Sequence, residues 1–176
     1  MMGKIALIYG VISGLVLVAS FGFTIPNEGE IDFKRGETVG MVVMVVSLGL
    51  ILFAIRAYRK ALDTSVFSFG QGFRVGILTT LIASIIYVGG WMIFFESVGD
   101  NFTTQYKEYY ITQIGSNETL TDEEKEIQIS EFENGVDEYT KNAGTRMLMT
   151  FTEIFPIGFL ITIISALLLR KKGAIT

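Results

Sequence analysis

The sequence predicts an all-α integral membrane protein with four transmembrane helices and a small helical extracytoplasmic domain between the third and fourth helices. Half of the 176 residues are hydrophobic and only 18% are charged, whereas a soluble domain usually carries about a quarter charged residues. The chain also contains four long stretches almost without charge, each near the roughly 20 residues that cross a bilayer. A soluble chain with four such helices would have no polar surface left.

The four stretches lie between charged residues. Three hold no charge at all and the fourth holds only Glu153: residues 5–27, 38–55, 75–95 and 147–169. The expected organisation is three membrane helices within residues 1–96, an acidic domain at 97–145, and the fourth helix with a basic tail at 146–176. The first three helices are placed at about 5–25, 38–58 and 73–95. The first could instead be a signal peptide, but its apolar run is too long for a typical one.

Charges are segregated along the chain. Basic residues gather beside one set of helix ends, with Asp63 as the only acid among them: Lys4, Arg56, Arg59, Lys60, Arg74, Arg170, Lys171 and Lys172. The loops at the opposite ends are acidic. Because Lys and Arg accumulate in cytoplasmic loops, we expect both termini to lie in the cytoplasm.

The acidic segment at 97–145 shows helical patterns. Thr121 and Glu124 form a capping-box pattern, in which each side chain satisfies a backbone N–H of the other residue. Four apolar residues then recur on one helical face: Ile129, Phe132, Val136 and Tyr139. We expect two helices, at about 100–114 and 121–142, joined by a turn near Gly115.

Glycines recur four residues apart at three places, which are Gly10/Gly14, Gly36/Gly40 and Gly72/Gly76. The absence of a side chain lets membrane helices approach closely. We expect close helix packing at these pairs, either within the chain or against a neighbouring protein.

Glu153 is the one acid within a predicted span, near its outer end. Pro156 follows it and removes a backbone hydrogen bond. Freed carbonyls beside a carboxylate could bind a cation or a proton. The interpretation we favour is an interfacial Glu153 that reaches water or pairs with Arg146. A polar pathway through the bundle would use Glu153 with residues of the third span: Thr79, Thr80, Ser84 and Tyr87.

The predicted cytoplasmic loop mixes bases with aromatic residues. Arg56, Arg59, Lys60 and Arg74 could contact anionic lipid head groups. The plainer interpretation is that they anchor the topology and that the chain simply turns back into the membrane.

The residue inventory restricts function. Cysteine and histidine are absent, so neither a disulfide nor a thiolate or imidazole ligand is available. We expect no enzyme activity, no cofactor, no metal site, no binding of nucleic acid and no identified small-molecule substrate.

The expected partners are membrane lipids and another membrane protein or a second copy of the chain. The leading hypothesis is an accessory or scaffold subunit of an inner-membrane assembly. The alternative is a small translocator or flippase helper for a lipid-linked or cationic substrate.

The chain resembles a Bacteroidetes family of four-span membrane proteins, catalogued as domain of unknown function 4199, over nearly its whole length. The resemblance rests on short segments from all four spans: Tyr9-Gly10 with Gly14, Ile55-Arg56-Ala57-Tyr58-Arg59, Phe67-Ser68-Phe69 with Gly72 and Gly76, Pro156-Ile157-Gly158, and 167–172. It implies the four-span fold and a location in the bacterial cytoplasmic (inner) membrane. No activity is established for the family, so it implies no catalytic residues.

Overall fold

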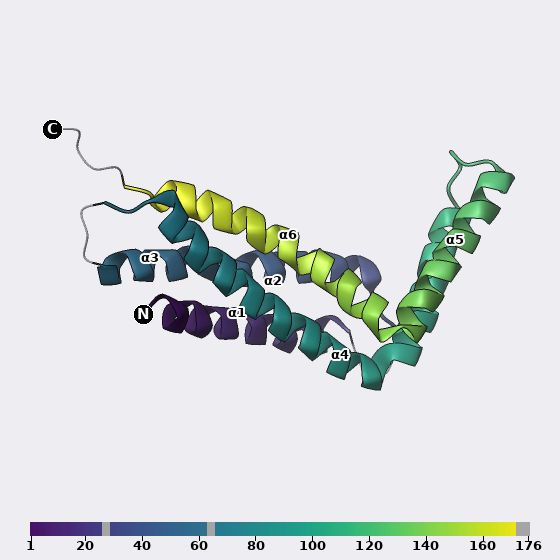
Figure 1. Ribbon diagram of the computed structural model, residues 1–176. Coiled ribbons are helices and arrows are strands. Elements are labelled where there is room, and N and C mark those ends of the chain that lie inside the picture. The colour runs from purple at the N-terminus through teal and green to yellow at the C-terminus, as the bar shows by residue number, and fades with distance from the viewer. Residues whose placement is uncertain (26–28, 63–65, 172–176) are drawn as a thin grey trace.

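The structure is a computed structural model and describes residues 1–25, 29–62 and 66–171. Within these ranges the chain is helical, apart from turns and one isolated β-bridge. The helices, shown in Figure 1, are α1 (Met2–Thr24), α2 (Phe33–Leu48), α3 (Leu50–Leu62), α4 (Phe69–Gly115), α5 (Asp122–Lys141) and α6 (Ala143–Leu169).

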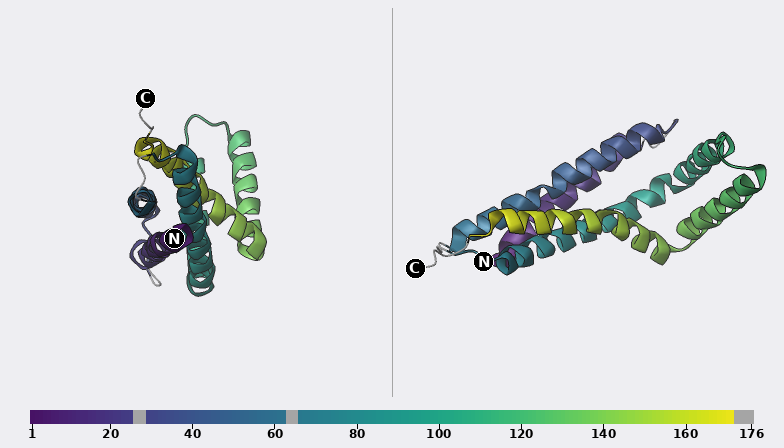
Figure 2. Two further views of the ribbon diagram at one scale, coloured as in Figure 1. Left: turned by 60° about the vertical axis from the view of Figure 1, so that its left-hand side comes forward. Right: turned by 90° about the horizontal axis from the view of Figure 1, so that it is seen from above.

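Among the described residues, four helical segments are long and apolar enough to cross a membrane: α1, α2 with α3, α4, and α6. They lie side by side, and α1 begins at the same end of the bundle where α6 ends (Figures 1 and 2). At that end Phe67 and Lys171 exchange two backbone hydrogen bonds of 3.0 and 2.8 Å. This end is called the terminal end below. The prediction of four helical segments that are long and apolar enough to cross a membrane is confirmed for the described residues.

The second span is two helices joined at Gly49. The Gly49 N–H donates to the carbonyls of both Val45 and Val46, and the Leu52 N–H donates to the Gly49 carbonyl at 3.1 Å. The bonds to Val46 and Gly49 are tighter three-residue steps, and here they accompany the regular α-helical bond to Val45. Beside them, the Ser13 hydroxyl of α1 donates to the Ser47 carbonyl at 2.8 Å, which ties α1 to the interruption.

The third span does not end at the predicted membrane boundary. Helix α4 has 47 residues, or about 70 Å at 1.5 Å per residue, which is more than twice a hydrocarbon thickness of about 30 Å. The prediction that a separate helix begins at about residue 100 is wrong, because α4 is continuous from Phe69 to Gly115. The predicted end of that helix, near Gly115, agrees with the structure. Two hydrogen bonds within α4 involve residues at the predicted boundary. The Thr104 hydroxyl donates to the Asp100 carbonyl, and the Gln105 side chain donates to the Asn101 side chain, both at 2.8 Å.

Helix α5 folds back along the outer part of α4. The predicted capping box at its start is present: the Thr121 hydroxyl accepts from the Glu124 N–H, and the Glu124 carboxylate accepts from the Thr121 N–H. Asp137 forms ion pairs with Lys107 of α4 and Lys141 of α5. The pKa of Asp137 is lowered to about 2, chiefly because the two ammonium groups donate hydrogen bonds to its ionised form. Residues 100–115 of α4 and helix α5 are together called the hairpin.

The stripe predicted on α5 faces the rest of the protein. Val136 is buried, and Ile129, Phe132 and Tyr139 are partly buried. Phe132 packs on two tyrosine rings of α4, with centroids 5.7 Å from Tyr106 and 5.5 Å from Tyr110. The chain passes from α5 to α6 through a single residue, Asn142, whose side-chain oxygen accepts from the Gly144 and Thr145 N–H groups.

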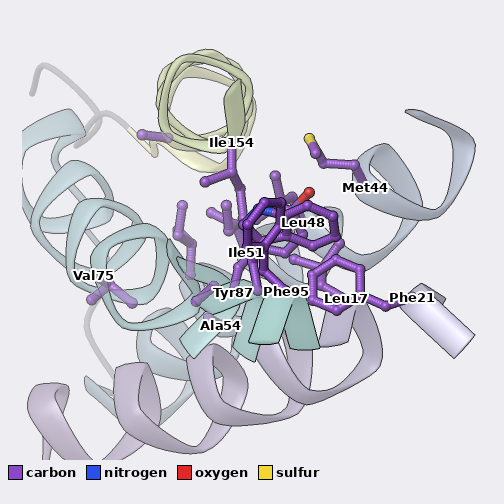
Figure 3. Close-up of a cluster of buried hydrophobic side chains, with 14 of the residues drawn as sticks. Leu17, Phe21, Met44, Leu48, Ile51, Ala54, Val75, Tyr87, Phe95 and Ile154 are labelled. Atoms are coloured by element: carbon purple, nitrogen blue, oxygen red, sulfur yellow. The ribbon is translucent and has the colours of Figure 1, made fainter. Parts of the chain in front are cut away.

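The core lies between the spans. Figure 3 shows buried side chains from α1, α2, α3, α4 and α6 that meet along the bundle axis, including Leu17, Leu48, Ile51 and Ile154. Many large apolar side chains instead point outward, as Leu15, Val46, Ile85, Ile93 and Leu168 do. An apolar exterior around a packed centre is the arrangement that lipid solvation favours.

Two of the three predicted glycine pairs lie at close helix contacts. A Cβ on Gly10 or Gly14 would come within 2.8 Å of Ile82 or Ile86 of α4, and one on Gly72 within 3.3 Å of Ala166 of α6. The partner helix is therefore in this chain.

The third pair does not follow this pattern. A Cβ on Gly36 would make only an ordinary 3.6 Å contact, and one on Gly40 would meet nothing within 4 Å. The prediction of close packing at this pair is wrong, because both residues line a cavity.

Candidate functional site

A cavity of about 670 Å³ lies between the spans at the hairpin end of the bundle. Helices α1, α2, α4, α5 and α6 all contribute to its wall, and α2 contributes Gly36, Gly40 and Met41, among others. Most of the lining is apolar or aromatic. Small-molecule sites typically measure 300–1,000 Å³ and combine an apolar lining with a few polar groups, so this cavity has the size and composition of a ligand site.

Glu153 projects into this cavity from α6. It lines the wall with Met149, Thr150 and Ile157, which lie on the same helix face. Glu153 is exposed in the described structure. Tyr87, which is buried on α4, lines the same cavity. Two of the predicted site residues, Glu153 and Tyr87, are thus brought together.

Arg146 is not the partner of Glu153. Its guanidinium donates from one terminal nitrogen to the carbonyls of Tyr139 (3.0 Å) and Thr140 (2.9 Å), at the end of α5. It also stacks over the Phe95 ring, 4.3 Å from the centroid. Arg146 therefore fixes the junction of α5 and α6. The Glu153–Arg146 pair, one of the two expected arrangements, is absent from the ion pairs of the described residues, so that part of the prediction is wrong. The other arrangement, a Glu153 that reaches water, stays a prediction, and the residue is exposed.

Pro156 lies one turn beyond Glu153, and α6 continues through it as an α-helix. Proline has no N–H, so the Thr152 carbonyl loses its normal intrahelical partner. Pro156 itself is exposed. A free carbonyl beside Glu153 stays a prediction, and Pro156 is not among the residues that line the cavity.

The other polar residues of the third span are packed tightly towards the terminal end. Thr79, Thr80 and Ser84 have no exposed surface. The Thr80 hydroxyl lies 3.1 Å from that of Thr162 on α6 and also donates to the Gly158 carbonyl at 3.3 Å. These threonines pack against glycines of the facing helix. The contacts between Thr80, Thr162, Gly76 and Gly158 are called the threonine–glycine seam. They belong to helix packing, not to a polar pathway.

The predicted lipid-contacting bases differ in their surroundings. Arg56, Lys60 and Arg74 are exposed. Arg59 is partly buried and donates to the Leu169 carbonyl at 3.0 Å, where a cation also compensates the negative end of α6. Arg59 therefore stabilises the terminal end, and the other three remain available to head groups.

Several lining residues were not predicted from the sequence. Glu37 of α2 lines the cavity, and its carboxylate accepts a hydrogen bond from the Tyr110 hydroxyl of α4. Burial and this hydrogen bond raise the pKa of Tyr110. Trp91, the one tryptophan, also lines the cavity and donates to the Tyr139 hydroxyl at 2.5 Å. Burial raises the pKa of Tyr139. The sequence pattern that could have indicated this site is the aromatic run at the outer end of the third span.

The serine and threonine hydroxyl groups of the cavity wall are engaged within their own helices. Ser20 donates to the Leu17 carbonyl, and Thr150 donates to the Arg146 carbonyl. No lysine or arginine lines it among the described residues. Nor do the described residues contain a group of three or more carboxylates placed to hold a metal ion. The arrangement is suited to binding.

Fold and site together define a multi-pass helical membrane protein with an aromatic, carboxylate-containing cavity at one end of its bundle. Residues 4–171 match the family described as "Protein of unknown function (DUF4199)", so the chain belongs to that family. No curated protein and no solved structure matches the chain significantly.

Proposed function

We propose that this protein is a non-enzymatic accessory subunit of the bacterial inner membrane that works by binding a membrane amphiphile in its cavity. In this proposal both termini are cytoplasmic and the hairpin faces the opposite side, where it is available to another membrane protein. The charge segregation supports this orientation, because the basic residues cluster at the terminal end and the acids at the hairpin.

The observation that carries the proposal is the contrast between the two ends of the bundle. The hairpin end holds a cavity large enough for a ligand. Towards the terminal end the threonine–glycine seam packs α4 on α6, with Thr80 and Thr162 fully buried. None of the four seam residues lines the cavity, and this close helix contact supports holding a ligand over conducting one.

The glycine contacts refine the scaffold hypothesis. Gly10, Gly14, Gly72 and Gly76 pack on helices of this chain, so they are not available to a partner protein. The surfaces left for a partner are the hairpin and the apolar outer faces of the spans.

The experiment uses a variant that fills the cavity without disturbing the fold. In Gly40→Leu, the new side chain starts from a Cβ with no neighbour within 4 Å and projects into the cavity. Gly89→Leu is the matched control, since Gly89 is also helical and open but is exposed and outside the cavity lining. Lipids that remain bound to each purified protein are extracted with organic solvent and quantified by mass spectrometry.

We expect wild type and Gly89→Leu to retain a stoichiometric amphiphile and Gly40→Leu to lose most of it. Equal retention by all three proteins would show that the cavity is not the binding site.

The alternative function, a translocator or flippase helper, is supported by Glu153, a carboxylate in a span without a basic partner in the described structure. Reconstituted vesicles with a fluorescent lipid distinguish the two. Protein-dependent lipid transfer between leaflets that Glu153→Gln abolishes would favour the alternative over the accessory role.

A further inference from the structure

We propose that the cavity selects amphiphiles whose head group is an ammonium cation, with Glu153 as its counter-ion and the surrounding aromatic rings as its cage. This inference rests on the proposed function and adds the chemical class of the ligand.

The first argument is charge. The cavity wall carries two carboxylates, Glu153 and Glu37, and no basic residue among those described. Glu37 already accepts from Tyr110. The nearest candidate cation on α6, Arg146, is used by α5 carbonyls and by the Phe95 ring. Glu153 is thus a carboxylate within a predicted span that has no basic partner among the ion pairs of the described residues, and charged groups within spans are normally paired.

The second argument is the aromatic wall. Phe21 lies 5.2 Å from both Tyr87 and Trp91, measured between ring centroids, and Trp91 lies 5.6 Å from Phe102. All four rings line the cavity. The face of an aromatic ring attracts cations, and ammonium ligands are commonly held in aromatic cages. A carboxylate beside several rings is complementary to an ammonium group and repels an anion.

The third argument is the remainder of the lining, which suits an alkyl tail. Three methionines from two helices face the cavity, namely Met41, Met44 and Met149, together with Leu17 and Ile157. Methionine side chains are unbranched and adapt to irregular apolar shapes. A flexible hydrocarbon chain fits such a wall better than a rigid ligand does. Entry from the lipid phase would bring this tail with the head group.

Trp91 gives a direct test, because it is the only tryptophan in the chain and lines the cavity. Bromine atoms quench tryptophan fluorescence at short range. Purified protein in a neutral maltoside detergent is titrated with three 9,10-dibrominated C18 probes that differ only in the head group: an amine, an alcohol and a carboxylic acid.

We expect the amine to quench Trp91 at concentrations about tenfold or more below those of the alcohol, as a hydrogen bond to a charged group would give, and the acid to be weakest. Glu153→Gln should remove the preference for the amine, so that the amine and the alcohol quench Trp91 at similar concentrations. Gly89→Leu should behave as wild type.

The possible outcomes distinguish the selectivity for an ammonium head group from amphiphile binding itself. Equal quenching by amine and alcohol in wild type would overturn ammonium selectivity and leave amphiphile binding intact. Strongest quenching by the acid would do the same. Unchanged quenching by all three probes in both Gly40→Leu and Gly135→Leu, which fill the cavity from α2 and α5, would overturn amphiphile binding itself.

Discussion

The threonine–glycine seam makes a quantitative prediction about Gly76→Ala. The added Cβ would approach Thr162 Cγ2 to 2.5 Å and Thr162 Oγ1 to 2.9 Å. Thr162 has no exposed surface and is bonded to Thr80, so it has no free space to move into. The helices α4 and α6 must separate, and the Thr80–Thr162 hydrogen bond is strained.

The magnitude follows from a comparison with Gly89→Ala, whose Cβ meets nothing within 4 Å. Both variants gain the same helix propensity, about 1 kcal/mol, which cancels between them. Overpacking costs about 1–3 kcal/mol, and a membrane-buried hydrogen bond contributes about 0.6 kcal/mol. Gly76→Ala should therefore be about 1.6–3.6 kcal/mol less stable than Gly89→Ala.

The assay is reversible unfolding in mixed micelles, followed through Trp91 emission, for both alanine variants and for the double variant Gly76→Ala/Thr162→Ala. Removing Thr162 Cγ2 and Oγ1 takes away the two nearest atoms, so the double variant should recover part of the loss and show a favourable coupling energy. If Gly76→Ala is as stable as Gly89→Ala, the inferred close packing of α4 on α6 is refuted.

Three further predictions concern the hairpin and the topology. Thr121→Ala should destabilise the start of α5 by about 1 kcal/mol, measured as faster hydrogen exchange in its first two turns; unchanged protection would contradict the role of the cap. A reporter active only in the cytoplasm should be active when fused to the C-terminus and silent when inserted at Asn117, and the reverse pattern would invert the orientation. Asp137 should titrate near 2, as its lowered pKa requires, instead of near 4, and Lys107→Met should raise that midpoint in carboxyl-carbon NMR. Because the pKa of Asp137 is lower in the folded than in the unfolded protein, its two ion pairs contribute stability above about pH 4, and this contribution is lost as the pH falls towards 2. A titration midpoint near 4 for Asp137 in wild type would refute the ion pairs.

The membrane character of this chain is determined by the sequence alone. Long uncharged runs can be solvated only by lipid, and this constraint depends on composition and on no particular contact. The capping box at Thr121 and the α5 stripe were likewise predictable, because both depend on residues within one or two turns of each other.

The site was decided by the tertiary structure. From the sequence, only the distance of Glu153 along its helix could be estimated, and that distance predicts an interfacial position. The face on which it lies, and the use of Arg146 by the end of α5, depend on how α4, α5 and α6 pack. Glu37 and Trp91 reach the same cavity from segments more than fifty residues apart, and no local pattern records that proximity.

The two kinds of glycine show the same division. Gly76 and Gly40 each belong to a pair spaced four residues apart, and the sequence predicts close packing for both. In the structure Gly76 lies against Thr162, whereas Gly40 faces the cavity. The sequence determined that these helices could approach closely. Only the arrangement of the neighbouring helices decided where they do and where they leave space for a ligand, because a missing side chain allows either outcome.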